Sequence, residues 1–277
     1  MKRSLLILTF SVLIWGGTMQ SFAQTYEEWI GKSYDYVEKE DLLAAEMSLK
    51  EALRLEPANP NNYALLTNLG TLQRRQGKKE EALVSYTAAL SRQPNNAVIL
   101  ENRASLYLEM GETDKALNDY DLLLLDNPIH EEALYNRGLI YIQQKQFLLA
   151  EQDFDKMMET NDASLYGRMG HAILEKTRGN YDESERIYNY LIERLPREWQ
   201  LYKGRADLYF LMGKNGRALN DVNKVFFESV PDAALYVLRG KIKLALYERG
   251  PAAADFRKAL EMGYDPQVVD ELLLLTK

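Results

Sequence analysis

The chain has 277 residues, of which 34 are basic and 41 acidic, so its formal net charge is -7. Nucleic-acid binding depends on lysine and arginine side chains that neutralise phosphates, so this acidic balance argues against a nucleic-acid partner. The chain contains no cysteine, which excludes disulfides, thiol catalysis, zinc–thiolate sites and the lipidated cysteine of a bacterial lipoprotein.

Residues 1–23 have the features of a signal peptide. Two basic residues precede a mostly apolar run over 4–16, and small residues then stand at the two positions that signal peptidase reads. Cleavage after Ala23 would leave Gln24 as the mature N-terminus. A retained membrane anchor is the alternative, but the apolar run is short beside the roughly 20 residues that span a bilayer. We therefore expect an exported protein, periplasmic or secreted if bacterial, with no integral membrane span after cleavage.

From residue 26 onward the sequence repeats itself. The repeats begin at residues 26, 63, 97, 131, 165, 199 and 233, so the first interval is 37 residues and each later one is 34. Each repeat spaces its apolar residues as two amphipathic helices joined by a short turn. A fixed period of this length predicts one array of stacked helical hairpins over 24–277 rather than separate globular domains.

The sequence marks a loop and several turns within the array. The connection 57–62, PANPNN, is three residues longer than later ones, so we expect a loop there and a break in the stacking. Glycine marks most turns between paired helices, with Gly179-Asn180 in repeat five and Gly250-Pro251 in repeat seven.

The end of the chain, 267–277, reads as a cap helix, because a repeat array needs a final element to cover its last core face. Leucine occupies all four positions over 272–275. We favour packing of these leucines on repeat seven, since exposed apolar patches are uncommon in soluble monomers. The alternative is contact with another chain, including a homodimer through these leucines.

Four positions, counted from the first residue of each repeat, define the pattern. Position 8 is small, because two helices approach closely there: Ser33, Gly70, Ala104, Gly138, Ala172, Ala206 and Gly240. Position 20 is also small: Ala45, Ala82, Ala116, Ala150, Ser184, Ala218 and Ala252. Position 24 is bulky: Leu49, Tyr86, Tyr120, Phe154, Tyr188, Val222 and Phe256. Position 32 is proline in four repeats: Pro57, Pro94, Pro128 and Pro196.

This pattern resembles the tetratricopeptide repeat family, whose period is 34 residues. The resemblance implies an all-α fold, a right-handed solenoid of about seven helical hairpins. Three repeats depart from it at position 32, with Asp162, Val230 and Tyr264. Repeat five also departs, with Arg168 and Glu175 at positions that are usually apolar.

Positions 7 and 23 vary together. Four repeats have arginine at position 7 and aspartate at position 23, and the other three repeats have neither. The pairs are Arg103 with Asp119, Arg137 with Asp153, Arg205 with Asp221, and Arg239 with Asp255. We predict an ion pair that joins the two helices of each hairpin, a structural role that keeps these residues out of the binding site.

The sequence offers no constellation for catalysis. A hydrolase or transferase needs a nucleophile, a base and an orienting group together, yet the only histidines are His130, in a loop, and His171, at a packing position. Neither has a metal-binding neighbour at helical spacing, and no glycine-rich phosphate loop is present. We expect no enzymatic activity, no cofactor and no metal.

A binding surface therefore remains as the functional feature. The resemblance implies that positions 2, 5, 6, 9 and 12 of the first helices line a concave groove. The candidate partner-binding residues there are Asn68, Thr71, Arg74, Asn102, Ser105, Tyr135, Asn136, Tyr166 and Met169. Asparagine offers both donors and an acceptor, so the position-6 row could hold an extended peptide backbone. This row resembles those in the superhelix of some protein glycosyltransferases, and local capping or hydration is the alternative.

Charge is uneven along the array. Residues 101–194 carry 10 basic and 19 acidic side chains, whereas residues 195–277 carry 13 and 11. The acidic middle could steer a basic partner region, or serve solubility alone. We expect a non-enzymatic scaffold or adaptor that binds another protein or peptide in an envelope or secreted assembly. The alternative is a component that captures a peptide or saccharide for uptake.

Overall fold

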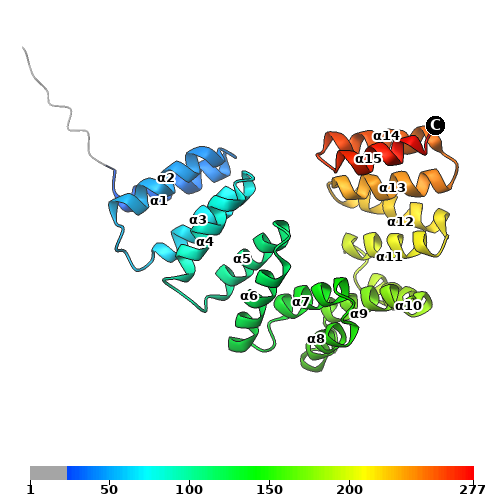
Figure 1. The fold of residues 1–277 in the computed structure, drawn as a ribbon, viewed down its shortest axis with the longest axis horizontal. Coiled ribbons are helices and arrows are strands. Elements are labelled where there is room, and N and C mark those ends of the chain that lie inside the picture. Colours follow the sequence, from blue (N-terminus) through cyan, green and yellow to red (C-terminus); the bar gives the residue numbers. More distant parts are fainter. Residues whose placement is uncertain (1–23) are drawn as a thin grey trace, which may run out of the picture. The chain divides into compact units, whose positions relative to one another are not determined.

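The computed structural model describes residues 24–277, and the predicted signal peptide lies outside this part. Within it, all regular secondary structure is α-helical, as predicted (Figure 1). The helices are α1 Tyr26–Glu38, α2 Leu42–Leu55, α3 Asn62–Arg75, α4 Lys79–Leu90, α5 Ala97–Glu109, α6 Thr113–Asp126, α7 Glu131–Gln143, α8 Phe147–Thr160, α9 Leu165–Arg178, α10 Tyr181–Arg194, α11 Trp199–Leu211, α12 Asn215–Glu228, α13 Ala233–Ala245, α14 Arg249–Glu261 and α15 Pro266–Leu274. Between residues 24 and 277, no helix is long and apolar enough to cross a membrane.

The chain forms two compact units, one ending at Arg92 and the other beginning at Gln93. The first unit contains the hairpins α1–α2 and α3–α4. The second contains five hairpins, from α5–α6 to α13–α14, and the cap α15. The seven predicted hairpins are therefore all present, and each coincides with one sequence repeat.

The first unit has a continuous core, so the predicted break in stacking after repeat one is wrong. Leu49 on α2 packs in the same cluster as Leu65 and Leu69 on α3. The long loop between these helices is fixed by buried Asn62, whose amide donates to the carbonyl oxygen of Glu56 at 2.6 Å. A buried amide with good partners specifies the path of a loop, because losing a partner would leave a polar group unsatisfied.

A buried carboxylate also ties this unit together. Glu46 on α2 accepts from Lys78 at 2.7 Å and from Gln76 at 3.0 Å, both in the α3–α4 turn. Lys50 lies 2.6 Å from the same carboxylate. Burial alone would raise the pKa of Glu46, but the hydrogen bonds from Lys50, Lys78 and Gln76 outweigh it and lower that pKa to about 2.

The helix turns agree with the sequence in repeat five and differ in repeat seven. Gly179 ends α9 with φ +87°, a conformation that favours glycine. In repeat seven the turn comes earlier than predicted, because Tyr247 takes the left-handed conformation at φ +63°. Gly250 and Pro251 lie in the first turn of α14, where proline is tolerated since its missing N–H has no helical partner.

The hairpins of the second unit are close-packed at the small position 8. A Cβ placed on Gly138 would lie 2.4 Å from the ring of Phe154, and one on Gly240 would lie 2.4 Å from the ring of Phe256. Both rings are fully buried. The bulky position 24 therefore fills the space that the small position 8 of the same repeat leaves.

The predicted ion pairs are present in all four hairpins. Each arginine donates from Nε and Nη2 to the two carboxylate oxygens of its aspartate, over distances of 2.6–2.9 Å. The arginine side chains are 16–20% exposed and the aspartates 3–9%. These are largely buried, two-point pairs, which combine strength with fixed geometry.

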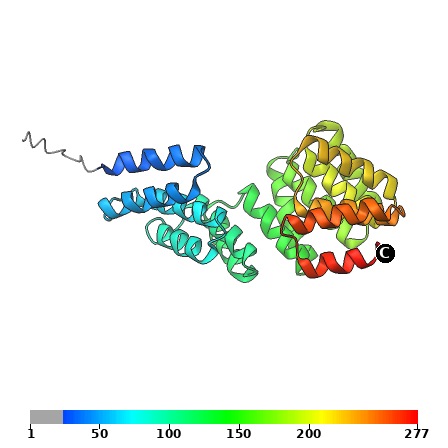
Figure 2. The ribbon, with the colours of Figure 1, turned by 90° about the horizontal axis from the view of Figure 1, so that it is seen from above.

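The cap α15 lies along α14 in both ribbon views (Figures 1 and 2). Its Val269 is fully buried, and Leu272 and Leu273 pack against the same cluster as Phe256. Leu274 and Leu275 are each 61% exposed. The four leucines are therefore divided, since two pack on repeat seven and two face outward.

Candidate functional site

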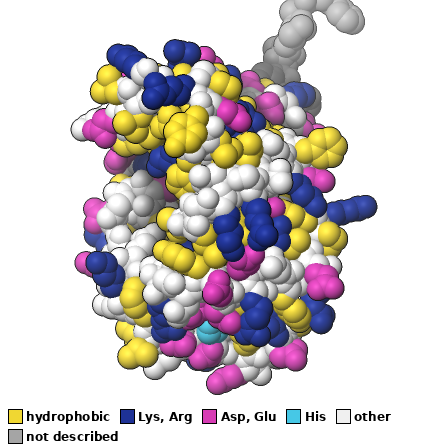
Figure 3. Space-filling model, turned by 90° about the vertical axis from the view of Figure 1, so that its right-hand side faces the viewer, with side chains coloured by type: hydrophobic (Ala, Val, Ile, Leu, Met, Phe, Trp, Pro, Cys, Tyr) yellow, Lys and Arg dark blue, Asp and Glu magenta, His cyan; other side chains and the backbone are white. Residues whose placement is uncertain are grey.

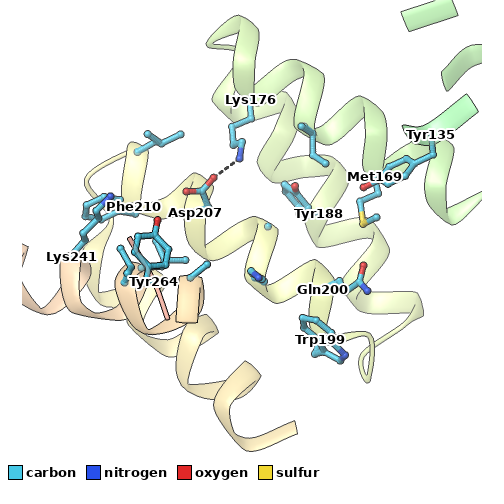
Figure 4. Close-up of a pocket in the computed structure, with 17 residues that line it drawn as sticks. Tyr135, Met169, Lys176, Tyr188, Trp199, Gln200, Asp207, Phe210, Lys241 and Tyr264 are labelled. Atoms are coloured by element: carbon cyan, nitrogen blue, oxygen red, sulfur yellow. Dashed lines mark hydrogen bonds and ion pairs between the residues drawn. The ribbon is translucent and has the colours of Figure 1, made fainter. Parts of the chain in front are cut away.

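The first helices of the second unit line a cavity of about 760 Å³ (Figure 4). Its walls come mainly from α7, α9, α11 and α13, while α10 adds Tyr188 and the loop before α15 adds Tyr264. Most lining residues stand at the positions that the resemblance assigned to the concave face. On α11, these are Gln200, Lys203, Gly204, Asp207 and Phe210, at positions 2, 5, 6, 9 and 12.

Aromatic and apolar side chains form most of the lining. Tyr135 and Met169 are drawn at one end of the cavity in Figure 4, while Phe210 and Tyr264 are drawn at the other. Tyr188 is 1% exposed, and burial raises the pKa of its hydroxyl. Burial likewise raises the pKa of Tyr135 to about 12. A tyrosine is neutral at physiological pH even with its ordinary pKa near 10, so both phenols keep a hydroxyl hydrogen to donate.

The polar part of the lining is dominated by cations. Lys176 donates to Asp207 across the cavity, an ion pair drawn in Figure 4. Lys203 donates to Asp232 at 2.7 Å. Lys241 is half-buried and has no ion pair with any residue in 24–277. The lining thus holds three lysines and one aspartate.

Two of the predicted binding residues, Tyr135 and Met169, line this cavity. Tyr166 is 37% exposed, outside the lining, with its ring centroid 5.1 Å from that of Tyr135. Gly170 and Gly204 stand at position 6 of repeats five and six, where close packing leaves no room for a side chain. A Cβ on Gly170 would lie 2.4 Å from Phe154, and one on Gly204 would lie 2.5 Å from the Tyr188 hydroxyl.

Asn102, Ser105 and Asn136 lie on α5 and α7, outside the cavity lining, and are half-buried. Within residues 24–277, the side-chain amides of Asn102 and Asn136 form no hydrogen bond, so both can bond the backbone of an incoming segment. Whether they do so remains a prediction.

The other three predicted residues belong to the first unit. Asn68 is exposed on α3 and, with Thr71, lines a smaller cavity of about 170 Å³. The Thr71 hydroxyl also lies 3.0 Å from that of Tyr86, so it already has a partner. Arg74, one turn further along α3, is half-buried and does not line this cavity. The structure therefore places only Asn102 and Asn136, of the three asparagines, within one unit.

Repeats six and seven contribute cavity residues that are absent from the predicted binding residues. Lys203, Asp207 and Phe210 occupy the same groove positions as the residues selected in earlier repeats, and Lys241 occupies position 9. Extending the position rule to these repeats would have found them. Tyr264 stands where a repeat normally ends in proline, but Asp162 and Val230 depart from proline in the same way, so the sequence did not single out Tyr264.

A pair of acidic side chains lies on the first helices of repeats three and four. Burial raises the pKa of Glu101 to about 7, and the nearby carboxylate of Glu132 adds to this. His130 Nδ1 lies 3.7 Å from Glu101 and accepts the N–H of Ala133, so this histidine caps the start of α7.

A second cavity, of about 550 Å³, opens among α8, α9 and α10. Its lining includes His171 and Ile187, the two residues that replace the arginine–aspartate pair in repeat five. His171 Nε2 lies 2.9 Å from Asp155 of the preceding repeat. Arg168 stacks over Tyr190 at 4.8 Å, so the irregular residues of repeat five line this cavity.

Across residues 24–277, no group of three or more histidine and acidic side chains is arranged to hold a metal ion. The cavity on the first helices combines aromatic rings, a lysine without a counter-ion and an open cleft. That combination can bind a partner segment.

Comparison with known proteins identifies the family. Sequence models of the tetratricopeptide repeat match residues 30–97, 102–164 and 169–234, and a second such model matches 85–118. A crystal structure of a tetratricopeptide repeat protein from Parabacteroides merdae is 67% identical, with a TM-score of 0.81, and the match covers 92% of this chain and 99% of that one. No curated protein matches the chain in sequence.

Two more distant structures share the fold alone. PilW, a type IV pilus biogenesis factor, is 20% identical with a TM-score of 0.58, covering 76% of this chain and 99% of PilW. Yeast Tom70 is 15% identical with a TM-score of 0.65, covering 94% of this chain and 58% of Tom70. The repeat matches and the 67% identical structure together show that this chain belongs to the tetratricopeptide repeat family.

Proposed function

We propose that this protein is a scaffold or adaptor of the bacterial envelope or the cell exterior, which holds a segment of a partner protein along its groove. Tetratricopeptide repeat proteins are in general non-enzymatic scaffolds for protein–protein interaction. The observation that carries the proposal here is the cavity of about 760 Å³ on α7, α9, α11 and α13. Its size is within the range of binding clefts.

The chemistry of the lining supports a protein partner. Tyrosine and tryptophan are enriched at interfaces, because each presents a large rigid surface together with a polar group. The cavity contains Tyr135, Trp199 and Tyr264, and Gln200 stands exposed at its edge. Partner side chains that bury these rings would contribute most of the binding energy.

The unbonded amides of Asn102 and Asn136 support the same proposal. They lie on α5 and α7, helices that precede α9 in the second unit. An extended segment that continues from the cavity toward these helices could bond both amides through its backbone. The cavity would then supply specificity, and the asparagines would hold the segment irrespective of its sequence.

Export is the second part of the proposal, and it rests on the signal-like sequence of residues 1–23. Mass spectrometry of the protein purified from its native envelope or medium should find a mature chain that begins at Gln24. A variant with Ala23→Arg should accumulate uncleaved, because signal peptidase requires a small residue there. An intact N-terminus in the wild-type protein would contradict cleavage.

Site-specific photo-crosslinking tests the groove. A benzoylphenylalanine introduced at Gln200, which is exposed and lines the cavity, should capture one partner protein in the native envelope fraction. The matched control is the same group at Gln152, an exposed residue of α8 outside the cavity. Equal capture at both residues, or capture at Gln152 alone, would move the binding surface away from the groove.

A variant with Asn102 and Asn136 both changed to alanine tests the asparagine row within the second unit. Loss of the crosslinked partner, with helicity and melting unchanged, would support binding through this row. Retention of the partner would restrict binding to the cavity.

Capture of a peptide or saccharide for uptake is the second candidate, because the lining of aromatic rings and polar side chains also suits a small ligand. It predicts that an oligosaccharide or short peptide raises the melting temperature while no protein is captured at Gln200. Capture of a protein without any such shift would contradict it.

A further inference from the structure

Resting on the proposed function, we infer that the segment held in the groove carries an acidic side chain that pairs with Lys241, flanked by apolar side chains. Lys241, its neighbours and the charges of the lining would together select a partner of this chemistry.

Lys241 differs from the other two lysines of the cavity. Lys176 and Lys203 are each neutralised by an aspartate, whereas Lys241 has no ion pair within the described residues. Its neighbour Lys243, two residues further on α13, lies 2.8 Å from Asp255. The fold therefore supplies counter-ions to the lysines around Lys241 and leaves this one to an incoming group.

The surroundings of Lys241 are apolar and aromatic. Figure 4 draws Lys241 beside Phe210 and Tyr264 at one end of the cavity, and Val237 and Leu238 precede it on α13. The Lys241 side chain is half-buried among these residues, and a charge that is partly shielded from water attracts a nearby carboxylate more strongly. A carboxylate of the bound segment would gain Lys241 as its counter-ion. The apolar residues beside that carboxylate in the segment would bury the rings of Phe210 and Tyr264.

The positive charge at this point is local. Lysine, arginine and acidic side chains are interspersed over the face drawn in Figure 3, and that face carries no large basic patch. The whole chain has a net charge of -7, which opposes a strongly acidic partner. A segment with a single acidic residue inside an apolar stretch fits both the single unpaired lysine and the negative net charge of the chain.

The apolar residues around Lys241 indicate whether the carboxylate of the bound segment is an internal side chain or a chain terminus. Val237 and Leu238 lie on one side of Lys241 along α13, and Tyr264 comes from a different segment of the chain. Several apolar contacts around one cation favour an internal aspartate or glutamate side chain, since a chain terminus has neighbours in one direction only.

Selection from a phage-displayed library of random 12-residue peptides, with both ends joined to the display protein, tests this inference. Residues 24–277 serve as bait. Selected peptides should share one acidic position between apolar ones. The affinity of the selected peptides should be about tenfold lower for the Lys241→Glu variant than for the wild type. Peptides whose acidic residue is changed to lysine should bind that variant with the lost affinity restored.

Arg257→Glu provides the matched control. Arg257 is exposed on α14 outside the cavity and, within the described chain, has no ion pair, so its reversal changes the net charge equally. It should leave peptide affinity unchanged. Both variants must first melt like the wild type.

Four outcomes would overturn the inference. The first is a selected set without acidic enrichment, and the second is equal affinity for wild type and Lys241→Glu. The third is that soluble peptides lose binding only when their C-terminal carboxylate is amidated, which would mean that the cavity recognises a chain terminus. Enrichment of no peptide also overturns it, and capture at Gln200 then decides separately whether the proposed function stands.

Discussion

Arg137 on α7 and Asp153 on α8 form a two-point ion pair, with Nε and Nη2 donating over 2.9 Å and 2.6 Å. The remaining nitrogen of Arg137, Nη1, donates to Asp121 of the preceding hairpin at 2.6 Å. In repeat six, Arg205 makes the equivalent third contact with Asn189. One guanidinium therefore joins the two helices of its own hairpin and also stacks that hairpin on its neighbour.

Asp153→Ala should destabilise the protein strongly, by about 3–5 kcal/mol, because it leaves the Arg137 charge largely buried without its main partner. Asp121→Ala is the matched control. Asp121 is 52% exposed, so its loss should lower the free energy of unfolding by only about 0–1 kcal/mol. Urea denaturation of both variants measures the difference, and equal losses would contradict the buried character of the Asp153 contact.

Glu101 should make stability depend on pH. Burial, with the charge of Glu132, raises the pKa of Glu101 from 4.5 to about 7. An acid with a raised pKa binds its proton more tightly in the folded chain than in the unfolded one, so stability falls as pH rises from about 4.5 through 7. Glu101→Gln removes this effect.

We therefore expect Glu101→Gln to be more stable than the wild type by about 3 kcal/mol at pH 8 and nearly equal to it at pH 4. Urea denaturation at both values measures this. The exposed Glu193, changed to glutamine, is the control and should show no such difference between the two pH values. A constant effect of Glu101→Gln at both pH values would rule out the raised pKa as its cause.

Repeat five should accept the ion pair that it lacks. His171 retains only the link to Asp155 of the preceding repeat, and Ile187 occupies the position of the missing aspartate. Ile187→Asp alone should destabilise the chain, since it places a carboxylate in a partly buried site without an arginine. His171→Arg together with Ile187→Asp should recover about 1–3 kcal/mol relative to the sum of the single changes. A double-mutant cycle by urea denaturation measures this coupling, and strict additivity would contradict it.

The cap should show two kinds of leucine. Leu273 packs against the cluster of Phe256, so Leu273→Ala should lower the free energy of unfolding by about 2 kcal/mol. Leu274→Ala should change it by less than about 0.5 kcal/mol, because Leu274 is 61% exposed. Similar losses would contradict the division seen in α15.

The hypothesis of a homodimer through this end concerns only the exposed pair. It predicts a concentration-dependent dimer in sedimentation that Leu274→Glu with Leu275→Glu abolishes. A wild-type monomer at every concentration would contradict it.

Most of the architecture could be predicted from the sequence, because each structural requirement recurs at a fixed interval. The small residue at position 8 predicted a close approach of two helices there, and the structure adds that the ring of Phe154 at position 24 is what approaches Gly138. The joint variation of positions 7 and 23 predicted four ion pairs, and all four are present. The turn in repeat seven was placed too late, because glycine and proline mark both turns and the first turn of a helix, and the local sequence does not distinguish these.

The sequence by itself determined the hairpins, their order and the residues that hold each one together, since these contacts lie within one period or between adjacent ones. Only the tertiary structure decided which parts of the groove form a cavity and which charges there are already neutralised. Lys176 and Asp207 are 31 residues apart, and Tyr264 reaches the cavity from outside the first helices. Such relationships depend on how successive repeats are rotated against one another, and that geometry arises from the summed packing of many side chains rather than from any single repeat.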